Sequence, residues 1–362
     1  MPEHGIQVDM PPAARLAMKG LGYFTWPLKI DDYLALINPL WSTAELRGRI
    51  ERIHRETDDA LTVYITPGFR WRGHEAGQYI RIGFDIEGKR HWRAYSLSSD
   101  GSRPDGQVTI TVKRTQEGVV SNWLHGPQAL GSLITLGQVD GQFTLPDPVP
   151  ERLLFLTAGS GVTPVMAMIR SLERSHAMPD TVHLHSARTA EEAIFAGALS
   201  DASSADPAYR FMPRSTATDG RITPADLDEL CPDWRERHTF ACGPGAMLDD
   251  LTEHFGGAGL DDRLHLESFE HILTSTTGQG GTITFTRSDA RADCAGDQVI
   301  LQAGEDAGVE MPFGCRIGIC HTCTGMLSSG TVRDLRTGNV TRAGTEVRTC
   351  VNCPDGDVTI DL

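Results

Sequence analysis

The pattern of apolar and polar positions divides the chain into segments with different periodicity. In "QVTITVKR", Val108, Ile110 and Val112 alternate with polar residues, which predicts a strand with one buried face. Similar runs, separated by glycine and proline, continue over residues 46–148. They predict a small antiparallel β-barrel.

The pattern changes at Glu151. "RLLFLTA" is a continuous apolar run, which is typical of a strand buried on both faces of a parallel sheet. A helical pattern follows it, and "TVHLHSA" and "HTFACGP" repeat the strand signal, each with helical sequence after it. The alternation predicts an open α/β sheet over residues 149–273. The predicted buried helix face after the first strand comprises Val165, Met168, Ile169 and Leu172.

The two ends of the chain differ from these segments. Residues 1–45 form an irregular arm, rich in aromatic residues and interrupted by prolines. Near the other end, residues 274–281 read "TSTTGQGG", a flexible linker, and residues 282–362 begin another β-rich unit with "TITFTR". The sequence therefore predicts three domains that follow an N-terminal arm.

Composition narrows the functional classes. A chain of 362 residues suggests two or three domains, and its net charge of -15 argues against a nucleic-acid partner. We expect no transmembrane segment, since no run approaches the roughly 18 apolar residues of a membrane span, and the start does not resemble a signal peptide. Five of the eight cysteines lie within Cys315–Cys353, which indicates metal ligands in a reducing compartment, and so a cytoplasmic protein.

Two metal sites compete for these cysteines. Cys320-x2-Cys323 with Cys350-x2-Cys353 has the form of paired zinc knuckles, but this assignment leaves Cys315 unused. The alternative combines Cys315-x4-Cys320-x2-Cys323 with one distant cysteine, which is the spacing of a plant-type 2Fe–2S cluster. We favour the iron–sulfur interpretation.

Two glycines and a histidine bear on this choice. Gly314 and Gly318 suit a loop whose backbone approaches the sulfur atoms of a cluster closely. His321 invites a Rieske interpretation, but a Rieske centre needs two histidines in place of two cysteines. We therefore expect an all-cysteine cluster of low potential.

The C-terminal motifs resemble a known family. "GCRIGICHTC" and "TCVNCPDGDVTIDL" resemble the plant-type ferredoxin signature, and residues 281–362 fit that module. The resemblance implies a β-grasp-like α+β fold and places the fourth ligand at Cys350. The implied ligand set is Cys315, Cys320, Cys323 and Cys350. Cys353 departs from the family's pattern and could compete with Cys350.

Two upstream segments resemble flavin motifs of the ferredoxin–NADP reductase superfamily. In "HWRAYSLSSD", the RxYS motif implies that Arg93 holds a flavin phosphate and that Tyr95 and Ser96 line the isoalloxazine ring. Guanidinium groups bind phosphate at two points, which agrees with this role. "VKRTQEGVVSNWL" resembles the second flavin segment, where a helix N-terminus faces the pyrophosphate. The implied flavin-binding residues there are Val112, Gly118, Val120 and Ser121.

"LTAGSGVTPVMAMIRSL" is a candidate nucleotide site. Gly159 and Gly161 end a buried strand, after which Thr163 is expected to cap a helix, with Pro164 in its first turn. A glycine turn that leads into a helix suits a nucleotide pyrophosphate. Thr157, in the same segment, is a further candidate contact.

The next strand end bears on which nicotinamide nucleotide is used. An acidic residue there would bind the ribose hydroxyls, whereas Ser186 and Arg188 suit a 2′-phosphate. We favour NADPH, and NADH remains the alternative.

Two later motifs also resemble the superfamily. "ACGPGAML" resembles its CGP motif, which implies that Cys242, Gly243 and Pro244 lie where nicotinamide meets flavin, with Met247 nearby. "LHLESFEH" resembles the final strand of the family. That resemblance places Glu267 and Phe269 near the flavin.

Together these resemblances cover residues 46–362 and imply a reductase. Electrons would pass from NAD(P)H through FAD and then a 2Fe–2S cluster to a terminal oxygenase, hydroxylase or membrane acyl-CoA desaturase. FMN could replace FAD, as in some similar proteins. The arm "FTWPLKIDDYLALINPLWS" resembles an extension in reductases that support desaturases or alkane hydroxylases, so the partner could hold the protein at a membrane surface. The rival class is a redox-sensing or zinc-stabilised binding module without turnover. The implied catalytic residues are Tyr95, Ser96, Cys242 and Glu267.

Overall fold

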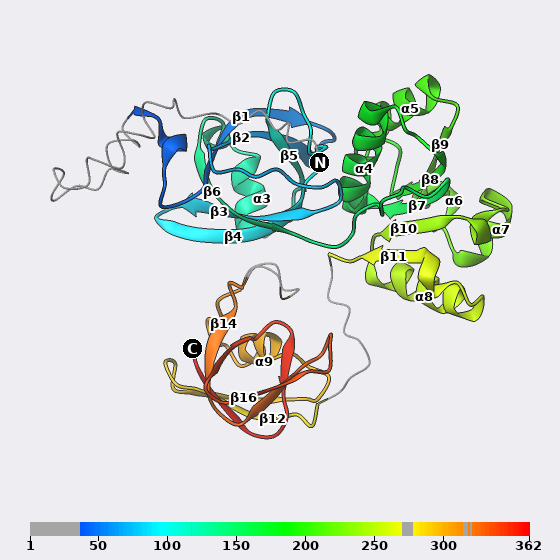
Figure 1. The fold of residues 1–362 in the computed structure, drawn as a ribbon. Coiled ribbons are helices and arrows are strands. Elements are labelled where there is room, and N and C mark those ends of the chain that lie inside the picture. Colours follow the sequence, from blue (N-terminus) through cyan, green and yellow to red (C-terminus); the bar gives the residue numbers. More distant parts are fainter. Residues whose placement is uncertain (1–36, 117, 270–277, 314–317, 319–320) are drawn as a thin grey trace. The chain divides into compact units, whose positions relative to one another are not determined.

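The computed structural model describes residues 37–116, 118–269, 278–313, 318 and 321–362 (Figure 1). The chain forms two compact units. The first comprises the residues up to His91 and from Tyr95 to Glu267, and the second comprises Ser268–Leu362 together with Trp92–Ala94. Most of the predicted arm, part of the linker, and the cysteines at 315 and 320 lie outside the described residues.

The first unit begins with a six-stranded antiparallel sheet in the order β4-β3-β6-β1-β2-β5. The Ser98 N–H donates to the carbonyl of Thr109 at 2.8 Å, and Leu97 forms a β-bridge with Ile110, so the chain after β4 pairs with β5. This pairing closes the sheet, and the prediction of an antiparallel β-barrel is confirmed. The elements are η2 (Pro39–Trp41), β1 (Arg47–Arg55), β2 (Ala60–Pro67), β3 (Tyr79–Ile86), β4 (Lys89–Ser96), β5 (Val108–Lys113), α3 (Val119–Leu124), η3 (Pro127–Ala129) and β6 (Leu133–Asp140).

The strand β5 corrects one prediction. Its apolar side chains lie in the barrel core, but Thr109 and Thr111 on the other face are also buried. The Thr111 hydroxyl lies 2.8 Å from that of Thr62 and 3.0 Å from that of Ser98, and a turn of the following domain packs against the same strand. The expectation of a single buried face was therefore wrong, because neighbouring hydroxyls satisfy the polar groups that burial removes from water.

The second part of the first unit is a five-stranded parallel sheet in the order β11-β10-β7-β8-β9. In Figure 1, α4 and α5 lie on one side of this sheet and α8 on the other. The predicted open α/β sheet is confirmed, and the predicted helix face on α4 is buried. The elements are β7 (Arg152–Ala158), η4 (Gly159–Gly161), α4 (Val162–Ser175), β8 (Asp180–Ala187), α5 (Ala196–Ala205), β9 (Tyr209–Ser215), α6 (Thr216–Asp219), η5 (Pro224–Asp226), α7 (Leu227–Leu230), η6 (Trp234–Glu236), β10 (His238–Cys242), α8 (Gly245–Gly257), η7 (Asp261–Arg263) and β11 (Leu264–Glu267).

Two arginines on α4 join the parallel-sheet domain to the barrel. The Arg174 guanidinium binds the buried carboxylate of Asp100 through two hydrogen bonds, of 2.9 and 3.1 Å. Arg170 donates to the carbonyl of Ser98 at 2.6 Å. Both acceptors lie in the loop that follows β4, so these bonds fix α4 beside the segment with the predicted flavin motif.

The second unit has a mixed five-stranded sheet, β13-β12-β19-β14-β17, and a three-stranded sheet, β16-β15-β18. The central strands β12 and β19 are parallel, and α9 contacts β13. This arrangement confirms the predicted β-grasp-like α+β fold. The elements are β12 (Gly281–Phe285), β13 (Ala290–Cys294), α9 (Ile300–Asp306), β14 (Thr324–Ser329), β15 (Thr331–Asp334), β16 (Val340–Arg342), β17 (Thr345–Arg348), β18 (Asn352–Pro354) and β19 (Val358–Asp361). Within the described parts of both units, each helix is too short or too polar to cross a membrane.

Candidate functional site

The carboxyl ends of β7 and β10 form the centre of the candidate site. These neighbouring strands occupy the position where the strand order reverses, which is where open α/β sheets bind ligands. Gly159 has a φ of +54°, and a Cβ atom on Gly161 would lie 2.1 Å from the carbonyl oxygen of Cys242. The turn therefore requires glycine, and it brings the two predicted nicotinamide motifs into contact.

The start of α4 differs from the prediction. The helix begins at Val162 with Gly161 as its N-cap, so the expectation that Thr163 caps it was wrong. The glycine turn runs directly into the helix and leaves Thr163 inside the first turn, where its hydroxyl donates to the carbonyl of Ser160 at 2.9 Å. Pro164 lies in the first turn, as predicted.

Three predicted catalytic residues come together beside this turn. Cys242 and Glu267 are paired neighbours on β10 and β11, and the Ser96 hydroxyl lies beside the Glu267 carboxyl group. Burial dominates and raises the pKa of Glu267 to about 8, while burial and then the Glu267 charge raise the pKa of the Cys242 thiol. At neutral pH, the Glu267 carboxyl group and the Cys242 thiol are therefore both mainly protonated and neutral.

Ser96 and Glu267 also carry unmatched polar atoms. Ser96 Oγ and Glu267 Oε2 are buried, and neither makes a hydrogen bond of standard geometry to another described residue. Buried polar atoms normally have hydrogen-bond partners. The presence of two such atoms near each other therefore favours a bound polar group between the end of β4 and the end of β11. The polar edge of a flavin ring system fits this requirement.

The remaining flavin candidates occupy the barrel. Arg93 and Tyr95 lie on β4 with Ser96, and the Tyr95 ring packs edge-on against Phe84 at 6.3 Å. Gly118 is the N-cap of α3, where a Cβ atom would lie 2.1 Å from the Thr115 hydroxyl. The side chains of the predicted contacts Val112 and Val120 lie in the barrel core.

The side chain of Thr157, a predicted nucleotide contact, lies beside two histidines. Its hydroxyl lies 2.8 Å from a ring nitrogen of His183 and 2.8 Å from one of His185, and all three side chains are buried. Burial lowers the pKa of both histidines, that of His185 to about 4, so both rings are neutral. The Thr157 side chain thus belongs to a buried network, and a cofactor contact from this residue would come from its backbone.

The predicted 2′-phosphate residues lie at the carboxyl end of β8. Ser186 is buried and Arg188 is exposed. On the adjacent strand Arg214 is the paired neighbour of Ser186, and its guanidinium is held by the carbonyls of Gly220 and Asp219. The sequence analysis missed Arg214, since only strand register brings it beside Ser186. Ser186 also lines a cavity of about 20 Å³ with Met247, which has room for little more than a water molecule.

In the second unit, the three described cysteines of the predicted cluster motifs separate into two environments. Cys323 Sγ and Cys350 Sγ are buried and lie 3.0 Å apart. Cys353 is also buried, but its Sγ faces Gly278, where a Cβ atom would lie 2.5 Å away. Two thiolates about 2.3 Å from one tetrahedral metal ion lie roughly 3.8 Å apart. The Cys323 and Cys350 sulfur atoms are closer than this, so a shared iron would fit between them after a small outward movement of the two side chains.

Comparisons with known proteins decide the family. The model of the "Oxidoreductase FAD-binding domain" matches residues 71–144, and that of the "2Fe-2S iron-sulfur cluster binding domain" matches residues 283–355. The "NADPH oxidoreductase" of Mycobacterium tuberculosis is 44% identical, over 98% of this chain and 94% of that protein. The chain belongs to this family of FAD-binding, 2Fe–2S oxidoreductases.

Other members extend the comparison. The "Glycine betaine monooxygenase reductase subunit" of Chromohalobacter salexigens is 28% identical, over 89% of this chain and 96% of its own. The fold matches the solved structure of phthalate dioxygenase reductase with a TM-score of 0.58 and 22% identity, over 88% of this chain and 98% of that chain. The chain is therefore an oxidoreductase with an FAD-binding domain and a 2Fe–2S cluster-binding domain. Bound flavin accepts electron pairs from nicotinamide, and a cluster accepts single electrons.

Replacing Glu267 by glutamine should make the free energy of unfolding less dependent on pH. The carboxyl pKa is about 8 in the folded protein, above its ordinary 4.5, so the folded state holds a proton that the unfolded state releases. The resulting stability is complete below about pH 4.5 and is lost as pH rises toward 8, at about 1.4 kcal/mol per pKa unit. Urea denaturation of the apoprotein at about pH 5 and pH 8 measures this difference. Parallel pH profiles for the two proteins would contradict it.

Proposed function

We propose that this protein takes electrons from NADPH and delivers them, through FAD and the 2Fe–2S cluster, to the terminal component of an oxygenase-type system. The observation that carries the proposal is the buried pair Ser96 and Glu267, whose Oγ and Oε2 atoms make no hydrogen bond of standard geometry to a described residue, beside Cys242 at the carboxyl ends of the parallel strands. These residues would hold the reacting edge of the flavin and exclude water from it. The chain's contribution to hydride transfer is then mainly positioning.

The cluster ligands in this proposal are Cys315, Cys320, Cys323 and Cys350. The close approach of the two described thiols supports the last two, and the direction of the Cys353 thiol toward Gly278 supports leaving Cys353 out. Thiolate ligands suit iron–sulfur chemistry.

The acceptor is proposed from the relatives. A monooxygenase reductase subunit is among them, so an oxygenase or hydroxylase component is the first candidate, and a membrane acyl-CoA desaturase is the second. With a membrane-bound acceptor, the protein would work at the membrane surface through that partner. A redox sensor or zinc-stabilised module would require neither the glycine turn nor the buried Ser96–Glu267 pair.

NADPH is the proposed donor because Ser186, Arg188 and Arg214 gather at the ends of two adjacent strands. The carbonyls that hold the Arg214 guanidinium occupy only two of its five N–H groups, which leaves donors for a phosphate. A 2′-phosphate there would receive charge-assisted hydrogen bonds, which are stronger than neutral ones.

The test is an anaerobic reaction of the purified protein with each nucleotide. NADPH should bleach the flavin absorbance and then that of the cluster, with kcat/KM about tenfold or more above that for NADH. Arg188→Ala should reduce this preference about tenfold or more by removing a charged contact with the phosphate, while activity with NADH stays unchanged. Arg210→Ala, an exposed arginine at the opposite end of β9, is the matched control. Equal use of both nucleotides by the unmodified protein would refute the donor, and stoichiometric zinc without iron would refute the function.

A further inference from the structure

A buried carboxylate in the second unit holds two arginines. Asp334, at the end of β15, is 7% exposed and accepts hydrogen bonds from the Arg336 guanidinium at 3.1 and 2.7 Å. The Arg336 backbone N–H donates to the same carboxylate at 2.9 Å. Arg348, at the end of β17, forms an ion pair with it at 3.8 Å. One acidic side chain thus orients two guanidinium groups, one in the turn after β15 and one at the end of β17.

Both arginines face Gly318, which lies between the proposed ligands Cys315 and Cys320 in the sequence. Arg348 Nη1 donates to the carbonyl of Gly318 at 2.7 Å. A Cβ atom on Gly318 would lie 2.6 Å from Arg336 Nη1, and the φ of this glycine is +76°. The two guanidinium groups therefore pack directly against Gly318.

The charges in this arrangement do not cancel. Two guanidinium groups and one carboxylate give a local charge of +1, and the arginine side chains are only 28% and 33% exposed. Reduction of a 2Fe–2S cluster adds one negative charge, and nearby charge is one of the factors that set its potential. Positive charge held beside the loop favours the reduced form, and partial burial limits its screening by water.

We propose that Asp334, Arg336 and Arg348 form a charged bracket that fixes the cluster loop at Gly318 and raises the reduction potential of the cluster. Asp334 acts as a positioning residue, whose own negative charge partly offsets the arginines. The proposal rests on the cluster ligands assigned above. The bracket would make electron transfer from the flavin to the cluster more favourable.

The test is the cluster's reduction potential, measured by spectroelectrochemical titration of the full-length holoprotein. Arg348→Gln should shift the potential to more negative values, because it removes a positive charge. Asp334→Asn should shift it to more positive values, because it removes the negative charge with little change in shape. The matched control is Arg287→Gln, which removes an arginine from an exposed ion pair with Asp361 and should leave the potential unchanged.

The expected shifts in reduction potential for Asp334→Asn and Arg348→Gln have opposite signs. This difference separates an effect of charge from loss of structural support for the loop, which would act in the same direction in both variants. If Asp334→Asn and Arg348→Gln shift the potential in the same direction, or if neither shifts it, the proposal is wrong. If Asp334→Asn does not retain iron, Arg348→Lys decides the question: it keeps the charge, and its potential should stay close to that of the unmodified protein. A Lys variant that shifts as far as the Gln variant would also overturn the proposal. Absence of iron from the unmodified protein would instead refute the proposed function itself.

Discussion

Cys350→Ser should abolish the 2Fe–2S cluster or change its absorption spectrum markedly, whereas Cys353→Ser should leave both cluster and spectrum intact. The Cys350 thiol lies 3.0 Å from that of Cys323, close enough for both to bind one iron, and serine is a harder and poorer ligand for iron. The Cys353 thiol faces Gly278 instead. Because both cysteines are buried, Cys353→Ser is a matched control for the loss of a buried sulfur.

Activity gives an independent measure of the same change. Cys350→Ser should lose NADPH-dependent reduction of a one-electron protein acceptor such as cytochrome c, while reduction of ferricyanide at the flavin continues. Loss of ferricyanide reduction with flavin still bound would show that the assumed electron order is wrong. The reverse spectral pattern would reassign the fourth ligand to Cys353. Retention of the cluster in both variants would mean that either cysteine can substitute for the other.

The sequence predicted those parts of the fold that depend on local patterns. The apolar run of β7, the glycine turn after it and the CGP segment after β10 each carry their signal within a few residues. Their meeting at one sheet edge also follows from sequence, because parallel strands bring their carboxyl ends together. For this part of the site, local sequence patterns and the known topology of parallel sheets were enough to predict which segments meet.

Predictions that depended on neighbours distant in sequence were incomplete. The polar face of β5 was expected to be exposed, but hydroxyls of Thr62 on β2 and of Ser98 in the loop after β4 satisfy it. Arg214 was missed because its position beside Ser186 depends on strand register. The ion pair between Asp334 and Arg348 joins the ends of two strands that belong to different sheets. A single sequence contains no local signal for such contacts.

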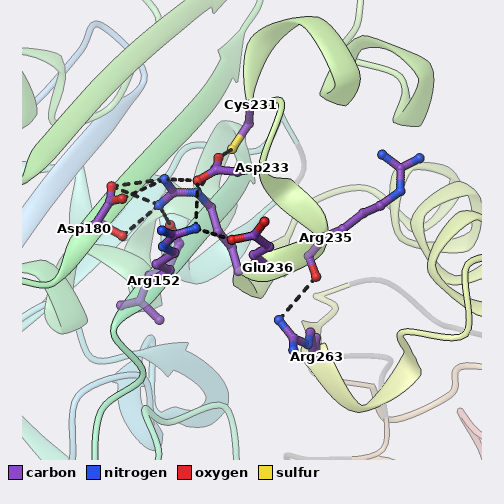
Figure 2. Close-up of polar contacts among 9 residues, drawn as sticks. Arg152, Asp180, Cys231, Asp233, Arg235, Glu236 and Arg263 are labelled. Carbon is purple, nitrogen blue, oxygen red and sulfur yellow. Dashed lines mark hydrogen bonds and ion pairs between the residues drawn. The ribbon is translucent and has the colours of Figure 1, made fainter.

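Arg237→Ala should lower the stability of the first unit by about 3 kcal/mol or more, which corresponds to about 6–12 °C in Tm for a unit of this size. The Arg237 side chain is 3% exposed and lies at the amino end of the parallel sheet. Its guanidinium binds the carboxylates of Asp180 and Asp233, at distances down to 2.7 Å, and donates to the carbonyl of Leu153 at 3.2 Å. Figure 2 shows Asp180 and Asp233 on the two sides of this network.

The cost arises because the bonds join three parts of the chain at once. Asp180 begins β8, Leu153 lies in β7, and Asp233 precedes β10. Removal of the guanidinium takes this donor from the Leu153 carbonyl and the ion pair from Asp180, and leaves Asp233 with its longer, 3.7 Å pair to Arg152. Arg237→Lys keeps the charge but has a single nitrogen, so it should recover only part of the loss.

Arg235→Ala is the control, since Arg235 is a neighbouring arginine with an exposed ion pair to Asp228, of a kind that contributes about 1 kcal/mol or less. Thermal unfolding followed by circular dichroism measures all three variants. If Arg237→Ala costs no more than Arg235→Ala, the network does not hold the strands together. In that case the stability of this sheet edge would come from its apolar core alone.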